Sequence, residues 1–230
     1  MKLCVSLDLK NKKENLKLAK ELKGHNVWLK VGFKSFISSG KKLLNELKDI
    51  NPDFKIFLDL KLYDIPNTMA EAAQKICKLP IDMFNVHASS GFEAMDLVKR
   101  SVQAEKSNPL ILAVTALTSF DNTSFRQIYN QDLALQTRYF AELAFRARLD
   151  GVVCSAFESF DIKEHTSKTF LSLCPGIRPF KENNADQKRV ADLNLAKKEE
   201  ADFIVIGRPI YESKSPKDTV EKILTIIESK

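Results

Sequence analysis

The chain has 230 residues, of which 44% are hydrophobic and 29% charged, and its formal net charge is +6 at pH 7. This composition fits a folded domain rather than a disordered chain, and no segment approaches the ~20 apolar residues of a membrane span. The run from Met1 to Asp8 is too short and too polar at its end for a signal peptide. We therefore expect a soluble protein that does not associate with a membrane.

Cysteine, histidine and glycine usage narrows the possible classes further. The four cysteines, Cys4, Cys77, Cys154 and Cys174, lie far apart without a C-x-x-C pair, which predicts neither a disulfide framework nor a zinc site. This usage favours a reduced, cytoplasmic compartment. The three histidines lack the spacing of metal ligands, and the chain has no glycine-rich dinucleotide or triphosphate loop. We expect no metal and no cofactor.

The basic residues are spread along presumed helix surfaces with acids between them, as from Lys10 to Lys23. Such a spread is typical of a solvated face rather than of a nucleic-acid-binding surface. A small anionic substrate is the better match, and we expect no nucleic acid partner. A non-catalytic basic binding protein stays open as an alternative, for which the charge is the only support.

Apolar runs of β type alternate with amphipathic segments along the chain. The predicted strands are Lys2 to Leu7, Val27 to Val31, Lys55 to Leu60, Met83 to Val86, Leu110 to Thr115, Gly151 to Cys154, Thr169 to Cys174 and Phe203 to Ile206. The predicted helices are Asn15 to Leu22, Ser35 to Leu47, Thr68 to Cys77, Phe92 to Glu105, Asp132 to Arg148, Phe157 to His165, Gln187 to Lys198 and Lys217 to Glu228. This alternation predicts a (β/α)8 TIM barrel, and no linker divides residues 1–230 into further domains.

The stretch from Phe57 to Thr68 places Asp59, Lys61 and Asp64 at the end of an apolar, β-type run. Because side chains alternate across a strand, Asp59 and Lys61 share one face, and the intervening leucines share the other. Isolated ions inside a barrel are costly unless they are paired or used. A structural ion pair is the plain alternative, but the exit from a strand into a loop favours a catalytic group.

Polar residues stand at the carboxyl ends of most predicted strands, where barrel enzymes carry their chemistry. In chain order they are Asp8, Lys30, Asp59 with Lys61, Asn85 with His87, Thr118 with Ser119, Arg178 and Arg208. Four of these residues are ions that converge from neighbouring strands. Because a buried network of charges is seldom more stable than apolar packing, their convergence indicates a function. For a lone residue such as His87, anchoring of a loop is an equally good interpretation.

Two segments near the C-terminus indicate phosphate binding. Gly207 and Arg208 follow the last strand, where barrels commonly bind phosphate through backbone N–H groups and a cation. The long polar segment from Arg178 to Arg189 is typical of a mobile lid over a phosphorylated ligand, although an ordinary solvated loop has the same composition.

Together these residues resemble the orotidine 5'-phosphate decarboxylase family. The stretch from Asp59 to Thr68 is similar to the signature of the family. Further segments that fall in family order are Ser6 to Asp8, Lys30 to Gly32, His87 to Ser89, Val114 to Ser119, Pro175 to Pro179, Asp186 to Arg189 and Ile206 to Pro209. Tyr63 replaces a more usual histidine and Ser90 a usual glycine, but the family assigns chemistry to neither position.

The resemblance implies metal-free and cofactor-free decarboxylation of orotidine 5'-monophosphate to uridine 5'-monophosphate, the last step of de novo UMP synthesis. In this scheme Lys61 protonates C6 of the pyrimidine, and Asp59, Lys30 and Asp64 complete the catalytic group. The implied substrate contacts are Asp8 and Lys30 at the ribose, Thr118 and Ser119 at the pyrimidine, Gln187 between base and phosphate, Gly207 and Arg208 at the phosphate, and Arg178, Ile65 and Thr68 elsewhere in the site. The resemblance also implies a homodimer with shared sites, in which the loop carrying Asp64, Ile65 and Thr68 reaches into the neighbouring subunit.

A related barrel group with the same Asp-x-Lys-x-x-Asp triad is a further alternative. It comprises keto-gulonate-phosphate decarboxylases and hexulose-phosphate synthases, and the resemblance implies that such an enzyme uses magnesium and sugar phosphates. The segment from Ile65 to Thr68 and the residue Gln187 argue against this group.

Overall fold

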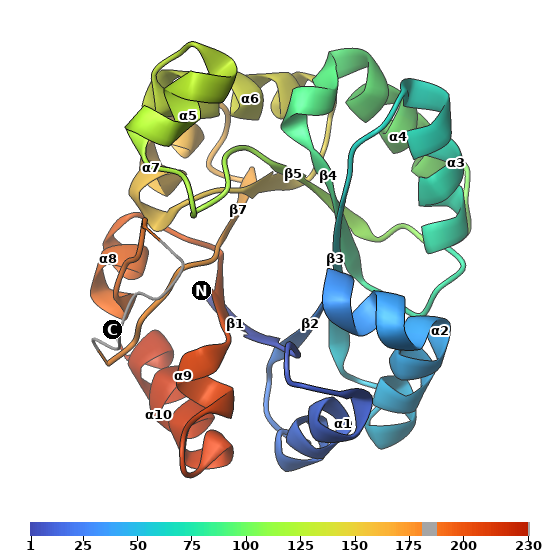
Figure 1. The fold of residues 1–230 in the computed structure, drawn as a ribbon, viewed down its shortest axis with the longest axis vertical. Coiled ribbons are helices and arrows are strands. Elements are labelled where there is room, and N and C mark those ends of the chain that lie inside the picture. The colour runs from blue at the N-terminus through green and yellow to red at the C-terminus, as the bar shows by residue number, and fades with distance from the viewer. Residues whose placement is uncertain (181–187, 230) are drawn as a thin grey trace.

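Eight parallel strands form a closed barrel surrounded by helices in the computed structural model, which describes residues 1–180 and 188–229 (Figure 1). Each strand pairs with the next along the chain, and β8 pairs with β1 to close the ring. The prediction of a (β/α)8 barrel is therefore confirmed. The strands are β1 (Lys2–Ser6), β2 (Trp28–Gly32), β3 (Lys55–Leu62), β4 (Met83–His87), β5 (Leu110–Val114), β6 (Gly151–Val153), β7 (Leu171–Cys174) and β8 (Phe203–Ile206).

Helices follow the strands and cover the outside of the barrel (Figure 1). They are α1 (Lys12–Glu21), α2 (Phe33–Ile50), α3 (Pro66–Ile76), the short 3-10 helix η1 (Ala88–Ser90), α4 (Gly91–Gln103), α5 (Asn122–Tyr129), α6 (Leu133–Arg146), α7 (Ala156–His165), α8 (Leu193–Lys198), α9 (Arg208–Tyr211) and α10 (Pro216–Glu228). Capping side chains define several helix starts. The carboxylates of Asp121, Asp132 and Asp192 accept backbone N–H groups in the first turns of α5, α6 and α8.

The helical predictions need correction at several places. The helix predicted over residues 187–198 begins only at Leu193, because Asp192 caps it and residues 188–192 are not helical. The pattern does not predict the short helices η1 and α9. It also does not predict α5, whose start is stabilised by a reciprocal capping box between Asp121 and Ser124. The other predicted boundaries differ from the observed ones by no more than three residues.

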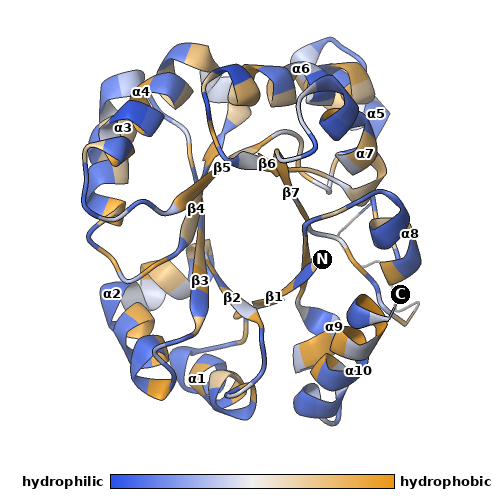
Figure 2. Cartoon of the chain, turned by 180° about the vertical axis from the view of Figure 1, so that it is seen from behind, coloured by the Kyte–Doolittle hydropathy of each residue, from blue (hydrophilic) through white to orange (hydrophobic). Residues whose placement is uncertain are grey.

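The apolar core has an inner and an outer part. The strands carry much of the apolar character, whereas hydrophilic residues colour large parts of the helices (Figure 2). Outward side chains of the strands, such as Val5, Leu29 and Phe84, pack against the helices. The inward side chains that fill the barrel are Cys4, Trp28, Phe57, Met83, Leu112, Val114, Val153, Leu173, Phe203 and Val205.

The filling of the barrel becomes polar toward the carboxyl ends of β1 to β4. The next inward positions on these strands hold Ser6, Lys30, Asp59 and Asn85, because side chains two residues apart lie on the same face of a strand. Apolar side chains therefore fill the interior of the barrel toward the amino ends of the strands. Polar groups lie toward the carboxyl ends, where barrel enzymes carry their sites.

All four cysteines are buried and free, and burial raises the pKa of the Cys4 thiol. Among the described residues, none of the helices combines the length and apolar character that crossing a membrane requires.

Candidate active site

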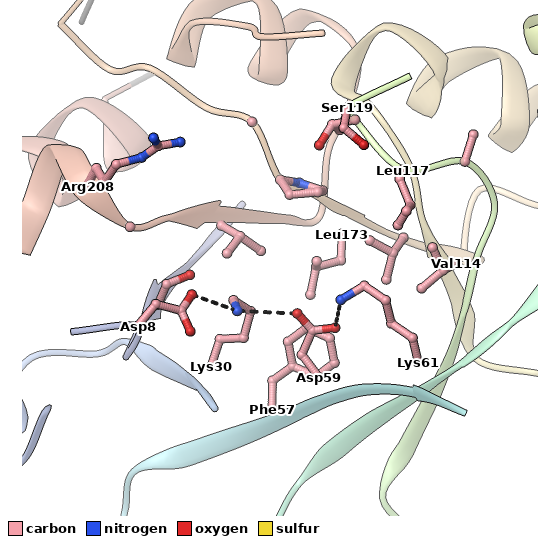
Figure 3. Close-up of a pocket in the computed structure, with 18 of the residues that line it drawn as sticks. Asp8, Lys30, Phe57, Asp59, Lys61, Val114, Leu117, Ser119, Leu173 and Arg208 are labelled. Atoms are coloured by element: carbon pink, nitrogen blue, oxygen red, sulfur yellow. Dashed lines mark hydrogen bonds and ion pairs between the residues drawn. The ribbon is translucent and has the colours of Figure 1, made fainter. Parts of the chain in front are cut away.

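A cavity of about 650 Å³ opens at the carboxyl-terminal end of the barrel (Figure 3). Its volume lies in the range of small-molecule sites. Nine of the site residues expected from the sequence line it: Asp8, Lys30, Asp59, Lys61, Thr118, Ser119, Arg178, Gly207 and Arg208. The strands β1, β2 and β3 supply one wall, and the loops after β5, β7 and β8 supply the other.

Four side chains of alternating charge form a row along the cavity (Figure 3). Lys30 Nζ lies 3.1 Å from Asp8 Oδ2 and 3.3 Å from Asp59 Oδ2. Lys61 Nζ lies 2.6 Å from Asp59 Oδ1. The two inner side chains, Lys30 and Asp59, are each only 12% exposed, so each of them needs its opposite charge nearby. The ions expected at the strand ends thus converge into one continuous row, which we call the charged row.

The two buried members of the charged row keep each other ionised. Burial by itself would raise the pKa of Asp59, but Lys30 and Lys61, together with the hydrogen bonds from Lys61 and Asn85, lower it to about 2. Burial would lower the pKa of Lys30, but Asp59 and Asp8 raise it above its ordinary value. Both groups are therefore charged throughout the neutral pH range.

Gly32 leaves the room that the first ion pair of the row needs. A Cβ atom at this position would lie 3.1 Å from Lys30 Nζ and 3.3 Å from Asp8 Oδ1. Both distances are shorter than nine in ten of the contacts that Cβ atoms make in proteins. A side chain here would push one of the two charges away from its partner.

Lys61 lies on a bulge of β3. Leu58 pairs with Phe84 and Leu62 with Val86, so four steps along β3 (62 − 58) match two along β4 (86 − 84). The φ angle of Lys61 is +50°, in the left-handed region, which costs a lysine about 1–2 kcal/mol. The strict alternation expected from the sequence ends before Lys61, although its ammonium group still reaches the charged row.

Asn85 is a site residue whose role the sequence did not reveal. It is fully buried on β4, opposite the bulge. Its Oδ1 accepts the backbone N–H of Lys61 at 2.7 Å, and its Nδ2 donates to Asp59 Oδ1 at 2.8 Å. The sequence does show a polar residue at an inward position of a strand. It does not show the hydrogen-bond partners of that residue, because they lie more than twenty residues earlier in the chain.

Gly207 and Arg208 lie where β8 ends, and Arg208 begins helix α9. A Cβ atom on Gly207 would lie 3.3 Å from Ser6 Cβ and 3.3 Å from the ring of Tyr211, so the backbone is closely surrounded here. Arg208 lies on the Asp8 side of the cavity, away from Lys61 (Figure 3). The cation and the reactive lysine expected from the sequence therefore stand at opposite ends of the charged row.

The loop after β5 brings Thr118 and Ser119 to the other wall and is tied to the residues before α8. The carbonyl of Thr118 accepts the backbone N–H groups of Lys188 (3.1 Å) and Arg189 (3.2 Å). The guanidinium group of Arg189 donates to two further carbonyls of the same loop and pairs with Glu158 on α7. These contacts hold the Thr118 loop against residues 188–189, which lie between β7 and α8. The sequence did not predict this connection.

Arg178 is buried in the cavity wall after β7, where its Nη1 donates to the carbonyl of Ile177 at 3.1 Å. Gln187 and most of the expected lid lie outside the described residues.

The other expected site residues, Asp64, Ile65 and Thr68, are exposed at the start of α3 and do not line the cavity of this single chain. The carboxylate of Asp64 accepts the backbone N–H of Ile65 at 2.7 Å.

The two departures from the family pattern both contact His87. The rings of Tyr63 and His87 lie 5.5 Å apart, and Ser90 Oγ donates to the carbonyl of His87 at 2.7 Å. Ser89 Oγ lies 2.6 Å from His87 Nδ1, so this histidine is anchored to its own loop. Burial and the nearby Lys61 lower the pKa of His87. The loop-anchoring interpretation of His87 therefore has direct structural support.

The chain is similar to known proteins over nearly its whole length. A family model described as orotidine 5'-phosphate decarboxylase / HUMPS family matches residues 1–223. The chain is 59% identical over 225 residues to a protein of a Nitratiruptor species named orotidine 5'-phosphate decarboxylase, covering 98% of this chain and 99% of the relative. A protein of the same name from a Sulfurovum species is 57% identical over 227 residues, covering 99% of each chain.

A solved structure supports the same assignment. The crystal structure of orotidine 5'-phosphate decarboxylase from Lactobacillus acidophilus is 34% identical in sequence, has a TM-score of 0.86 and covers 99% of each chain. Because these similarities run through nearly the whole chain, the chain belongs to the orotidine 5'-phosphate decarboxylase / HUMPS family.

Proposed function

We propose that this protein decarboxylates orotidine 5'-monophosphate to uridine 5'-monophosphate in de novo UMP synthesis, in the cytoplasm and without a metal or cofactor. The observation that carries the proposal is the charged row, which ends in Lys61 and lies in the cavity of a barrel whose relatives bear this name over their full length. The names of relatives at 57–59% identity favour this reaction over those of the magnesium-dependent sugar-phosphate enzymes that share the triad.

The substrate would lie along the charged row with its phosphate at the Arg208 end. The guanidinium group of Arg208 and the backbone of Gly207 would hold the phosphate, since both stand at the strand end where barrels commonly bind it. Asp8 and Lys30 would then meet the ribose hydroxyls. In this orientation the base would lie toward Lys61, which stands on the side of the cavity away from Arg208 (Figure 3).

The pyrimidine would lie between Lys61 and the loop that carries Thr118 and Ser119, whose hydroxyl and backbone groups can recognise its edge. Arg178 would contribute from the wall after β7, and Gln187 would link the base to the phosphate.

The chemical step needs a cation at the carbon that loses its carboxylate. When the bond between C6 and the carboxyl carbon breaks, CO2 departs and the electron pair stays on C6. The ammonium group of Lys61 would stabilise this pair and then transfer a proton to C6, after which its amine recovers a proton from water. Asp59 fixes the ammonium group at 2.6 Å. Asp59 would also lie against the substrate carboxylate and disfavour the anionic ground state relative to the transition state.

The proposed active unit is a homodimer that shares its sites. Asp64, Ile65 and Thr68 are exposed on the rim after β3, from which they can reach the site of a second copy. Apolar side chains on the same rim support a second copy as the partner. Four large apolar side chains are each more than half exposed here, namely Phe33, Ile37, Tyr63 and Ile65. A group of exposed apolar side chains on a protein surface often marks an interaction site.

The proposed reaction can be tested by following the change in ultraviolet absorbance when the purified protein is mixed with orotidine 5'-monophosphate. We expect turnover that survives EDTA treatment, because the proposed mechanism uses no metal. Loss of turnover with EDTA would point to the magnesium-dependent group, and absence of turnover with and without magnesium would refute the proposal. The Lys61→Ala variant is the control: it should lose turnover while still binding uridine 5'-monophosphate.

A further inference from the structure

We infer that Asn85 is a positioning residue that holds the backbone of Lys61 and the carboxylate of Asp59 in the geometry that the reaction needs. The inference rests on the proposed decarboxylation, because it concerns how Lys61 is presented to the substrate. Asn85 is not among the residues that line the cavity, so it acts through its two neighbours and not on the substrate.

The bulge of β3 creates the need for such a residue. Between the pairs Leu58 with Phe84 and Leu62 with Val86, β3 has three residues and β4 has only Asn85. A bulge interrupts the ladder of backbone hydrogen bonds and leaves the extra residues without their usual partners. The backbone N–H of Lys61 is one such group, and it donates instead to the side chain of Asn85 at 2.7 Å.

Lys61 depends on this bond more than an ordinary strand residue would. Its φ angle of +50° is one that non-glycine residues rarely adopt, so the surrounding structure has to hold it there. The side chain of Lys61 leaves the backbone from this conformation and reaches Asp59 at 2.6 Å. A relaxed backbone at Lys61 would redirect the ammonium group.

The second bond of Asn85 sets the orientation of Asp59. Its Nδ2 donates at 2.8 Å to Oδ1, the same oxygen that accepts Lys61 Nζ, whereas Oδ2 faces Lys30 at 3.3 Å. The amide therefore helps to fix the plane of a carboxylate that has to serve two lysines at once.

Only a side chain with one acceptor and one donor at this reach can make both bonds. An amide has both, a carboxylate has no donor, and an apolar side chain has neither. Asn85 has no exposed surface, so bulk water cannot replace the lost partners. These requirements explain a buried amide directly above an apolar barrel interior.

The test compares Asn85→Leu and Asn85→Asp with the wild type. Leucine keeps the approximate shape and removes both bonds, and we expect kcat to fall about 10²-fold because Lys61 is misplaced. KM for orotidine 5'-monophosphate should stay within about threefold, since the phosphate and ribose contacts come from other strands. As a matched control, Ser159→Ala removes a buried side-chain hydrogen bond outside the barrel, to Ser172 at 2.7 Å, and should leave kcat unchanged.

Asn85→Asp supplies a readout that a purely structural role would not alter. With one proton shared between the introduced carboxyl group and that of Asp59, the new side chain can again donate to Asp59 and accept from Lys61, as the amide does. As pH rises and that proton leaves, two carboxylates face each other and the donor is lost. The ratio of kcat for Asn85→Asp to that of the wild type should therefore increase as pH falls.

The outcomes separate the inference from the proposed function. Wild-type turnover together with a large loss of kcat in folded Asn85→Leu and a rising ratio at low pH would support the inference. A folded Asn85→Leu with kcat within threefold of the wild type, or a ratio that does not change with pH, would overturn it. If Asn85→Leu does not fold, the pH dependence of Asn85→Asp decides alone. Absence of turnover in the wild type would instead refute the proposed function.

Discussion

Lys30 and Asp59 illustrate how two buried charges become a stable part of the site. Neither would stay ionised alone in a position with so little solvent, because desolvation favours the neutral form of each group. Lys30 also pairs with Asp8, and Asp59 also accepts hydrogen bonds from Lys61 and Asn85. Removing one member would leave an uncompensated charge, which explains why the row spans three neighbouring strands and has no gap.

The lowered pKa of Asp59 has a consequence for stability. A group whose pKa falls from 3.8 to about 2 on folding stabilises the protein above pH 3.8, by about 2 kcal/mol, and loses this contribution as pH falls through about 2. We expect the free energy of unfolding of the wild type to exceed that of Asp59→Asn by a constant amount from pH 5 to 7. The difference should shrink to about half by pH 3. Urea unfolding of both proteins at each pH measures it, and a difference that grows toward acid would contradict this assignment.

Arg208 provides a test of the proposed phosphate site. Arg208→Ala should lower kcat/KM for orotidine 5'-monophosphate roughly ten- to a hundredfold, because hydrogen bonds to a charged group are worth about 1.5–3 kcal/mol. Arg100→Ala is the matched control, since it removes a surface guanidinium group that pairs with Asp96 away from the cavity. Added phosphite should activate the wild type toward the unphosphorylated nucleoside. An unchanged kcat/KM in Arg208→Ala would remove the phosphate from this end of the cavity.

At the scale of elements, three aspartates connect neighbouring strands at the amino-terminal end of the barrel, opposite the cavity. Asp82, Asp150 and Asp202 immediately precede β4, β6 and β8, and their carboxylates accept the backbone N–H groups of Ile56, Ile111 and Ser172 on the preceding strands at 2.8–2.9 Å. Each carboxylate also pairs with a lysine, namely Lys55, Lys99 and Lys163 respectively. The repeat connects β3 to β4, β5 to β6 and β7 to β8 by the same device.

We expect the loss of one of these aspartates to lower the free energy of unfolding without changing kcat. Asp150→Ala should lower the free energy of unfolding by about 3 kcal/mol, because it leaves the buried ammonium group of Lys99 unpaired. The kcat of the folded variant should equal that of the wild type. Adding Lys99→Met should recover part of the loss, so the double variant should be more stable than the sum of the single changes implies. Urea unfolding and steady-state assays on the same preparations measure both quantities. Strict additivity would show that the two residues do not interact.

At the scale of the whole molecule, the shared-site homodimer can be tested by mixing inactive subunits. Lys61→Ala and Asp64→Ala homodimers should each be severely impaired. Their heterodimer has one site with both lesions and one site with neither, so it should recover up to about half of the wild-type activity. Differently tagged subunits allow purified heterodimers to be assayed. If these heterodimers stay as inactive as the parents, Asp64 acts within its own chain.

Local sequence patterns were sufficient to predict the architecture and most of the residues that line the candidate site. Alternation of apolar strands and amphipathic helices is a local property, so periodicity was sufficient to predict the barrel and to locate most of its elements. Ions such as Lys30 and Asp59 at the ends of apolar runs are equally visible, because a charge at a buried position stands out from its neighbours. Parallel strands bring their carboxyl ends together, which is why these residues meet around one cavity.

The way in which Lys61 is held depends on contacts that form only in the folded barrel. The bulge at Lys61 depends on the register between β3 and β4, which no local pattern encodes. The bonds from Asn85 to Lys61 and Asp59, and those from Arg189 to the Thr118 loop, join segments far apart in the chain. Their partners become neighbours only when the barrel closes, and a residue's hydrogen bonds are satisfied by whatever group closure brings within reach.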